Sequence, residues 1–226
     1  MKLGVLFSGG KDSTLALHMT AEHEEATCLI TLVSKNPESY MFHTPNIHLT
    51  EIQAEATDLP LIAKVTEGRK EEELKDLEQA IKEAVNQHRI EGVVTGAVES
   101  VYQAERVQRI CNHLGIWCFN PLWKRNQKRL LEELVEKHFN VIISGIFAYP
   151  LDETWLGKQL NTDLIGRLVE LEKKFSISPS GEGGEIETTV LDAPLFKRRI
   201  EILASSVEAR GNSGVFKITK ARLVSK

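Results

Sequence analysis

Apolar residues occur in short runs that alternate with longer amphipathic segments over the first two-thirds of the chain. A run of four to eight apolar residues bounded by glycine or polar residues is typical of a buried strand, whereas apolar positions three and four residues apart indicate a helix. By these criteria we expect strands near 3–7, 26–33, 61–65, 92–95, 116–119 and 141–144. In the intervals we expect helices near 12–23, 49–59, 70–89, 101–114 and 126–138.

This order predicts an α/β fold with a doubly wound, mostly parallel five-stranded sheet, because parallel neighbours need a helical crossover between them. The run at 141–144 is expected to close the series as its last strand. After about residue 147 the pattern changes to one helix followed by strands near 186–191, 200–207 and 215–223. We therefore expect a nucleotide-binding domain over 1–146 and a smaller C-terminal α+β subdomain for substrate recognition over 147–226.

The composition excludes several classes of protein. Of the 226 residues, 42% are hydrophobic and 27% are charged, so global disorder is not expected. The formal net charge of -4 gives no overall attraction to phosphate backbones, which disfavours nucleic acid as a partner. No stretch is long enough for a membrane span, and no signal peptide is expected. Cys28, Cys111 and Cys118 contain no CxxC pair, so we expect reduced thiols and a cytoplasmic location, with a homodimer left open.

The turn between the first strand and the first helix, Ser8-Gly9-Gly10-Lys11-Asp12-Ser13, carries the most distinctive chemistry. Glycines let backbone N–H groups approach an anion closely, and a helix start adds unpaired N–H groups and a positive dipole end. Lys11 adds a point charge, and Asp12 is suited to hold Mg²⁺. We therefore expect this loop to bind ATP, with Asp12 as the metal ligand and with nucleotide contacts from Ser8, Gly9, Gly10, Lys11, Asp12 and Ser13.

The spacing of this loop differs from GxxxxGK[ST] and from GxGxxG. A plain alternative is a glycine turn followed by a helix that Ser8 or Asp12 caps, with Lys11 in solvent. The position after the first strand and the serines on both sides favour nucleotide binding over that alternative.

The loop SGGKDS resembles the pyrophosphatase loop, SGGxDS, of the N-type ATP pyrophosphatase superfamily (PP-loop, with a HUP-like fold). Four further stretches extend the resemblance to the diphthine–ammonia ligase family over nearly the whole chain: 41–45 (MFHTP), 96–100 (GAVES), 121–123 (PLW) and 181–185 (GEGGE). The resemblance implies ATP-dependent amidation of diphthine on elongation factor 2 by ammonia, through an acyl adenylate, with AMP and pyrophosphate released. Lys11 and Asp12 are then expected to be catalytic.

Four candidate site residues follow the fourth expected strand, at the carboxyl end of the sheet where α/β ligand sites gather: Gly96, Glu99, Tyr102 and Arg106. We expect Gly96 at the nucleotide and Glu99 in catalysis. Helical spacing puts Tyr102 and Arg106 on one side, where they are expected to meet the substrate. An ordinary surface ion pair between Glu99 and Arg106 or Arg109 is the alternative.

Two loops supply the remaining candidates. His43 is expected beside the nucleotide, although a loop histidine is commonly solvated. Glu182 and Glu185, in the glycine-rich GEGGE segment, are expected to face the substrate together with Glu187, and Glu185 is also expected to be catalytic. Acids beside an ATP site can orient ammonia or a cation, and diphthine carries a trimethylammonium group. An exposed acidic turn is the alternative.

Two other functions remain open on the sequence alone. The same ATP chemistry on a tRNA base is opposed by the net negative charge and by the lack of a basic extension or a cysteine pair. A module that senses ATP without cleaving it is opposed by Asp12 beside Lys11 and by the acids of GEGGE. No cysteine has the context of a glutaminase nucleophile, so free ammonia is the expected nitrogen donor.

Overall fold

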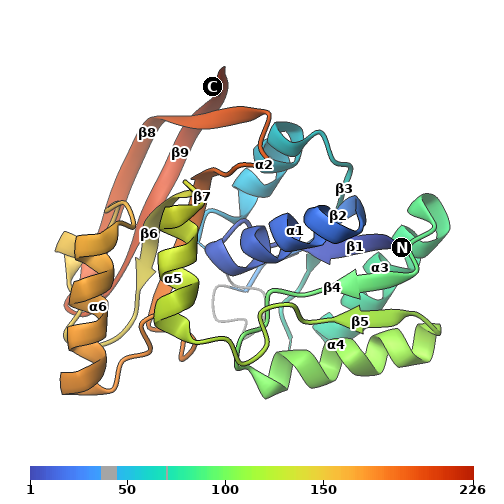
Figure 1. Ribbon diagram of the computed structural model, residues 1–226, viewed down its shortest axis with the longest axis horizontal. Helices are drawn as coiled ribbons and strands as arrows, with labels where there is room; N and C mark the ends of the chain where they lie inside the picture. Colours follow the sequence, from blue (N-terminus) through green and yellow to red (C-terminus); the bar gives the residue numbers. More distant parts are fainter. Residues whose placement is uncertain (37–44, 70) are drawn as a thin grey trace.

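The computed structural model describes residues 1–36, 45–69 and 71–226, which form two sheets (Figure 1). The first sheet is parallel, in the order β3-β2-β1-β4-β5, and the second is antiparallel, in the order β7-β6-β9-β8. The α/β prediction, with five parallel strands and a separate C-terminal sheet, is confirmed. The strands are β1 (Lys2–Leu6), β2 (Glu25–Ser34), β3 (Leu61–Thr66), β4 (Gly92–Val94), β5 (Trp117–Phe119), β6 (Asn140–Ile146), β7 (Ile186–Asp192), β8 (Arg198–Arg210) and β9 (Ser213–Ser225).

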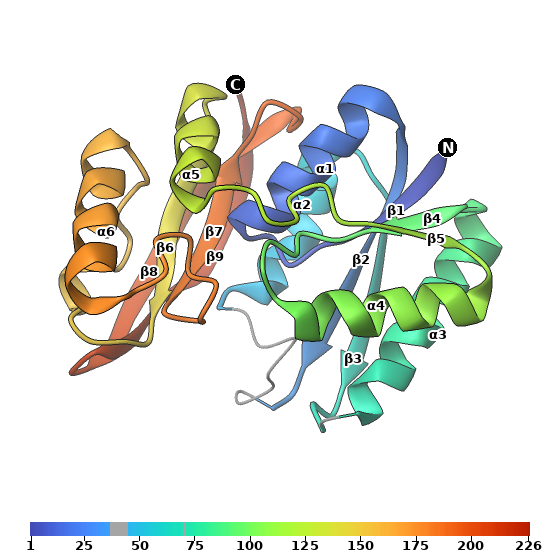
Figure 2. The same cartoon turned by 60° about the horizontal axis from the view of Figure 1, so that its bottom comes forward.

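Helices cover both faces of the parallel sheet (Figure 2). On one face, α3 and α4 pack through the apolar side chains of Leu77, Ile81, Val107 and Ile110 against Ile30 and Val93. The spacing of four between Leu77 and Ile81 places both on one helix side, as expected. The helices are α1 (Lys11–His23), α2 (Thr50–Thr57), α3 (Glu72–His88), α4 (Val101–Leu114), α5 (Gln127–Glu136) and α6 (Thr162–Phe175), with short 3₁₀ turns at Ile47–Leu49 and Glu153–Trp155.

One apolar core joins the two sheets. It runs from β1 through Leu15 and Leu17 of α1 to Leu131 and Leu134 of α5, and on to Ile143 of β6. The helices α5 and α6 lie side by side over the antiparallel sheet in both ribbon views (Figures 1 and 2). The second sheet is therefore held to the first by shared hydrophobic burial.

The prediction that 141–144 closes the parallel sheet is wrong. This segment belongs to β6, which pairs antiparallel with β7 and β9. Three apolar residues, 141–143, follow one another because both faces of β6 are buried, and such a run carries no information about strand direction. The second sheet thus begins at Asn140, seven residues before the expected start of the C-terminal subdomain.

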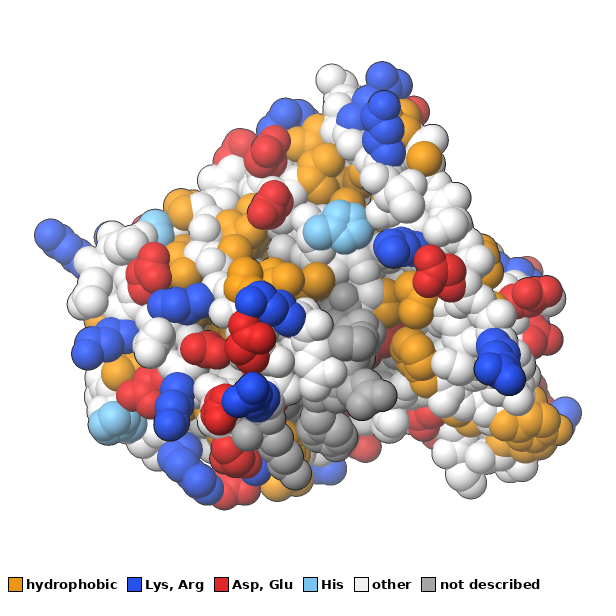
Figure 3. Space-filling model, turned by 180° about the vertical axis from the view of Figure 1, so that it is seen from behind, with side chains coloured by type: hydrophobic (Ala, Val, Ile, Leu, Met, Phe, Trp, Pro, Cys, Tyr) orange, Lys and Arg blue, Asp and Glu red, His pale blue; other side chains and the backbone are white. Residues whose placement is uncertain are grey.

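The C-terminal hairpin β8–β9 carries a local positive charge that the whole-chain value conceals. Between residues 197 and 226 there are eight Lys or Arg side chains and two Asp or Glu. Basic side chains gather around the ends of these strands in the rear view, at the top of the molecule (Figure 3). Within the described ranges, no helix combines the length and apolarity that crossing a bilayer requires.

Replacing Leu134 tests whether the shared core supports the fold. Leu134 is fully buried, so we expect Leu134→Ala to lower the free energy of unfolding by about 2–5 kcal/mol through lost burial and a residual cavity. Leu203→Ala is the control, because Leu203 is 44% exposed, and it should cost about 0.5 kcal/mol or less. Urea titration followed by circular dichroism measures both. Equal effects of the two substitutions would contradict this assignment of the core.

Candidate active site

A cavity of about 330 Å³ lies at the carboxyl ends of β1 and β4, where the strand order of the parallel sheet reverses. Its inner wall is apolar, and its outer wall comes from the loop and strand at 181–188, on the second sheet. The polar residues of the cavity include Ser8, Lys11, Asp12, Ser13, Thr95, Ser100, Gln103, Glu182, Glu187 and Thr188. Two segments that are far apart in the sequence therefore share one site.

The glycines of the loop are required by its close contacts. Gly9 has a positive φ of 76°, and a Cβ there would lie 2.1 Å from the Oε1 atom of Gln53. A Cβ on Gly96 would lie 2.8 Å from the carbonyl carbon of Asp12 and 2.8 Å from the nitrogen of Ser13. The loop after β4 thus touches the first turn of α1, and this contact leaves no room for a side chain.

The second sheet holds the loop by hydrogen bonds. The Gly9 carbonyl accepts from the Val190 N–H at 3.0 Å and from the Gln53 side-chain amide at 3.0 Å. The Lys11 N–H donates to the Thr188 hydroxyl at 3.1 Å. These bonds fix the loop before any ligand arrives, which is the preorganisation that an anion site requires.

The helix start is not capped in the way that the plain alternative requires. Gly10, rather than Ser8 or Asp12, occupies the N-cap position, and it has no side chain to fill the site. The Ser13 hydroxyl donates to the Gly10 carbonyl at 3.1 Å and lies 3.2 Å from the Ser8 hydroxyl. The two serines therefore brace the turn from both sides.

Lys11 is buried and ion-paired, so the alternative of a solvated lysine is wrong. Its Nζ atom lies 2.7 Å from Oδ2 of Asp12, and its side chain is 5% exposed. Burial opposes the charged form, but Asp12, Glu182 and Glu187 together hold the pKa of Lys11 above its ordinary value. Lys11 therefore stays cationic inside the cavity.

Glu182 and Glu187 form the acidic wall of the cavity. Both are half-buried and face the Lys11–Asp12 pair. Burial, aided by the Asp12 carboxylate, raises the pKa of Glu182. Burial raises the pKa of Glu187 to about 7. The charge of Lys11 lowers this pKa, but the carboxylates of Asp12 and Glu182 oppose that effect. Near neutral pH the Glu187 carboxyl group is therefore close to the midpoint between its protonated and ionised forms.

Glu185 does not line the cavity among the described residues; it holds the loop together. Its carboxylate accepts from the Ser178 N–H at 3.0 Å and from the Gly183 N–H at 2.9 Å. Its own carbonyl accepts from the Phe147 N–H at 2.9 Å. The structure therefore brings Glu182 and Glu187 to the site, whereas Glu185 shapes the segment that carries them.

Gln127 is a site residue that the sequence did not indicate. Its Oε1 atom accepts from the hydroxyls of Ser178 and Ser180, at 2.6 and 3.0 Å, and its amide lies 3.4 Å from a carboxylate oxygen of Glu99. Gln127 thus joins the start of α5 to the acidic loop. No spacing or motif marks such a glutamine, and the same is true of Gln53 and Thr188.

Of the candidates after β4, Gly96 lies in the cavity. Glu99 is exposed at the edge of the cavity, and its N–H donates to the Glu182 carboxylate at 3.2 Å. Tyr102 and Arg106 do not line the cavity as far as the described chain shows. The Arg106 guanidinium instead stacks on the Tyr102 ring, 3.4 Å from its centroid, and pairs with Glu71 at 2.9 Å. Their predicted contact with substrate stays a prediction. His43 lies outside the described residues.

Asp12 fits a magnesium ion that arrives with a nucleotide. In the ranges that the structure describes, no three His, Cys, Asp or Glu side chains converge into a metal site of their own. The Oδ1 atom of Asp12, however, is buried and has no hydrogen-bond partner among the described atoms. Because Mg²⁺ commonly takes one or two carboxylates and completes its shell with water and substrate phosphates, this single free oxygen suits it.

Gly96→Ala tests the close approach of the two loops. The added Cβ would collide with backbone, so we expect ATP binding to weaken about tenfold or more, since overpacking of this size costs about 1–3 kcal/mol. Gly166→Ala in α6 is the matched control, because a Cβ there meets nothing within 4 Å. Calorimetric titration with Mg·ATP would measure both. Unchanged affinity in Gly96→Ala would remove this contact from the site.

Comparison with known families and proteins assigns both halves of the chain. Residues 1–118 match the diphthamide synthase N-terminal domain, and residues 126–224 match the diphthamide synthase C-terminal domain. Proteins named diphthine–ammonia ligase are similar over most of the chain. The Mus musculus protein is 36% identical, covering 91% of this chain and 84% of its own length. The Homo sapiens protein is 33% identical, with 92% and 85% covered.

The Schizosaccharomyces pombe protein of the same name is 35% identical over 92% of this chain, which spans 37% of that longer relative. Because both domains match in order and together cover nearly the whole sequence, this chain belongs to the diphthamide synthase family.

Proposed function

We propose that this protein is an AMP-forming ligase that uses ATP to convert the carboxylate of diphthine into the amide of diphthamide. The observation that carries the proposal is the buried Lys11–Asp12 pair at an uncapped helix start, facing two acids across one cavity. The phosphate loop serves a nucleotide, and the acidic wall serves a cationic acceptor. Membership of the diphthamide synthase family supports the same reaction.

The first step is the attack of a diphthine carboxylate oxygen on the α-phosphorus of ATP. A new P–O bond forms, the bond from the α-phosphorus to the oxygen that bridges to the β-phosphorus breaks, and pyrophosphate leaves with the electron pair. Lys11 and the N–H groups at the start of α1 face the charge that builds on pyrophosphate. The apolar wall near Ile30, Leu32 and Leu77 suits the adenine ring.

The second step is the attack of ammonia on the carbonyl carbon of the acyl adenylate. A C–N bond forms, the bond from this carbon to the phosphate oxygen of AMP breaks, AMP leaves with the electron pair, and the nitrogen releases a proton to solvent. Ammonium must lose a proton before it can attack. Glu182 and Glu187 make the cavity attractive to ammonium and to other cations through their negative charge. We assign the attraction of the cation to Glu187 rather than to Glu185, because the carboxylate of Glu185 is engaged in loop hydrogen bonds.

Asp12 would hold Mg²⁺ through its free Oδ1 atom, and the ion would supply charge neutralisation at the phosphates. Elongation factor 2 is the proposed carrier of diphthine, and free ammonia is the proposed nitrogen donor. The proposed site of the reaction is the cytoplasm. The direct test combines the purified protein with ATP, ammonium and diphthine-bearing elongation factor 2, and measures AMP, pyrophosphate and the mass change of amidation. Formation of ADP in place of AMP would refute the proposal.

Asp12→Asn separates binding from turnover. The substitution keeps the shape of the side chain but removes the charge that would hold the metal. We expect kcat to fall about 100-fold or more, as for other losses of charge stabilisation in the transition state, while the Kd for ATP changes less than about tenfold. Filter binding and pyrophosphate release measure the two quantities. A variant with full turnover would show that Asp12 holds no catalytic metal.

The pH dependence tests Glu187. Because the pKa of Glu187 is about 7, the carboxylate becomes ionised as the pH rises from about 6 to about 8. We expect kcat/KM for diphthine to increase over this interval and to level off above it. Glu187→Gln should be slower and should lose this rise. The free ammonia concentration must be held constant, since it also increases with pH, and an identical profile in Glu187→Gln would contradict the assignment.

A further inference from the structure

Three large aromatic side chains are exposed near the end of β6 and the acidic loop. Phe147 is 39% exposed, Tyr149 is 67% exposed, and Phe175 is 43% exposed. Leaving aromatic rings in water is unfavourable, so a group of them beside a cavity indicates a binding surface. None of the three takes part in the chemistry described above.

Gly145 places Phe147 and Glu187 on one face of the sheet. Gly145 of β6 is the direct antiparallel partner of Glu187 in β7. A Cβ on Gly145 would lie 2.7 Å from the Phe147 ring and 3.0 Å from the Cβ of Glu187. The Phe147 ring therefore lies over Gly145 and beside the Glu187 side chain, in space that a larger residue at position 145 would fill.

Glu185 connects the chain segments that carry Tyr149 and Phe175. Its carbonyl accepts from the Phe147 N–H and its carboxylate from the Ser178 N–H, which lies three residues after Phe175. The rings of Tyr149 and Phe175 meet edge to face, with centroids 5.4 Å apart and planes at 88°. The segments that follow β6 and α6 are thus tied to the acidic loop, and the Tyr149–Phe175 contact joins these two segments to each other.

We propose that Phe147 and Glu187 bind a quaternary ammonium group on the substrate. Such a cation donates no hydrogen bond, so aromatic faces and carboxylates are the groups that recognise it. Lys11 pairs with Asp12 at 2.7 Å, so the negative charge of Glu187 is not taken up by a direct ion pair with Lys11 among the described residues. The segment supplies an aromatic ring and negative charge side by side.

The inference rests on the proposed function and names the recognition element of its acceptor. The trimethylammonium group of diphthine sits on the carbon that bears the reacting carboxylate. A receptor for the cation must therefore adjoin the phosphate loop. Glu187 meets this condition, since it lines the same cavity as Lys11 and Asp12.

Choline and its neutral isostere 3,3-dimethylbutan-1-ol provide the test, since they share a shape and differ in charge. With the wild-type protein we expect choline to bind, by NMR titration without ATP, and to compete with diphthine-bearing protein in the amidation assay. The neutral alcohol should bind about fivefold or more weakly, as the loss of a cation–π contact and its carboxylate partner predicts. Equal binding of the two compounds would overturn the proposal.

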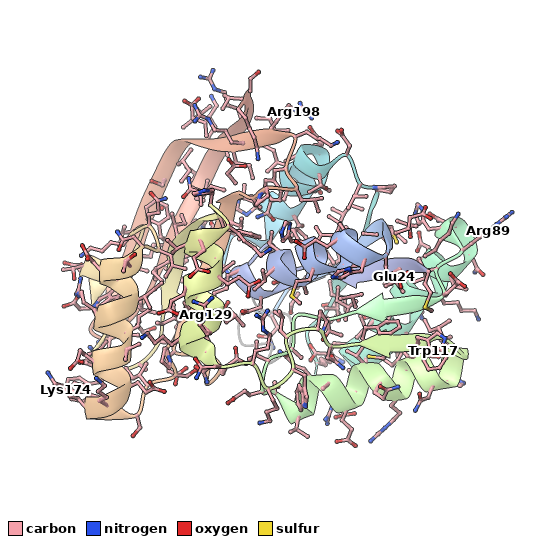
Figure 4. All side chains as sticks on the ribbon, viewed as in Figure 1. Glu24, Arg89, Trp117, Arg129, Lys174 and Arg198 are labelled. Carbon is pink, nitrogen blue, oxygen red and sulfur yellow. The ribbon has the colours of Figure 1, made fainter. Side chains whose placement is uncertain are left out.

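Substitutions locate the site. Phe147→Leu keeps apolar volume but removes the aromatic face, so we expect the Kd for choline and the KM for diphthine to rise about fivefold or more. Phe147→Trp should retain choline binding, because it keeps an aromatic face. Trp117→Leu is the control: Trp117 is 65% exposed, and it lies on β5 far from the second sheet (Figure 4). An unchanged Kd in a folded Phe147→Leu protein would refute the site.

The two proposals fail in different ways. If the wild-type protein amidates diphthine but choline binding ignores Phe147, the quaternary ammonium site is wrong and the ligase assignment stands. If choline binds in a Phe147-dependent manner but no AMP or diphthamide forms, the recognition site stands and the ligase assignment is wrong. Circular dichroism of each variant separates loss of binding from loss of fold.

Discussion

The contact between the turn before α1 and strand β7 is the constraint on which the site depends. The Gly9 carbonyl and the Lys11 N–H are both engaged by β7, through Val190 and Thr188. A loop held by its own strand and helix alone would be free to collapse onto the open helix start. Because β7 continues directly from the acidic loop, the same strand fixes the phosphate-binding turn and positions the acids opposite it. The two sheets are therefore parts of one site.

Charge balance at this cavity is consistent with the proposed metal-bound nucleotide and cationic acceptor. Lys11 faces the carboxylates of Asp12, Glu182 and Glu187, so acids outnumber the base in this half-buried group. A triphosphate alone would add negative charge to a cavity that already holds it, at a cost that rises with burial. Cations that arrive with the nucleotide and with the acceptor remove that cost. Burial is the main cause of the raised pKa of Glu187, and the carboxylates of Asp12 and Glu182 add to it.

Periodicity predicted the fold well where the local pattern determines it. The alternation of strands and helices was sufficient for the parallel sheet, and the strands expected near 200–207 and 215–223 correspond to β8 and β9. It failed for β6, because a strand buried on both faces reads the same in a parallel and in an antiparallel sheet. Net charge conceals local differences in a similar way, because the value of -4 for the whole chain is the sum of +6 over residues 197–226 and -10 over residues 1–196.

The sequence named the loop from Ser8 to Ser13 and also Gly96, Glu182 and Glu187, all of which line the cavity, but it missed the contacts that join distant segments. The loop from Ser8 to Ser13 is recognisable because all of its groups act within one turn of chain, and a short motif records that arrangement. Lys11 and Thr188 are separated by 177 positions, and Gln127 and Ser178 by 51, so no spacing rule connects them. For the same reason the sequence could name the acids after Gly181, and single out Glu185 as catalytic, without showing which of their carboxylates hold the loop together. Their roles depend on which carboxylates the loop consumes for its own hydrogen bonds, and Glu185 is consumed in this way whereas Glu187 remains available to a ligand.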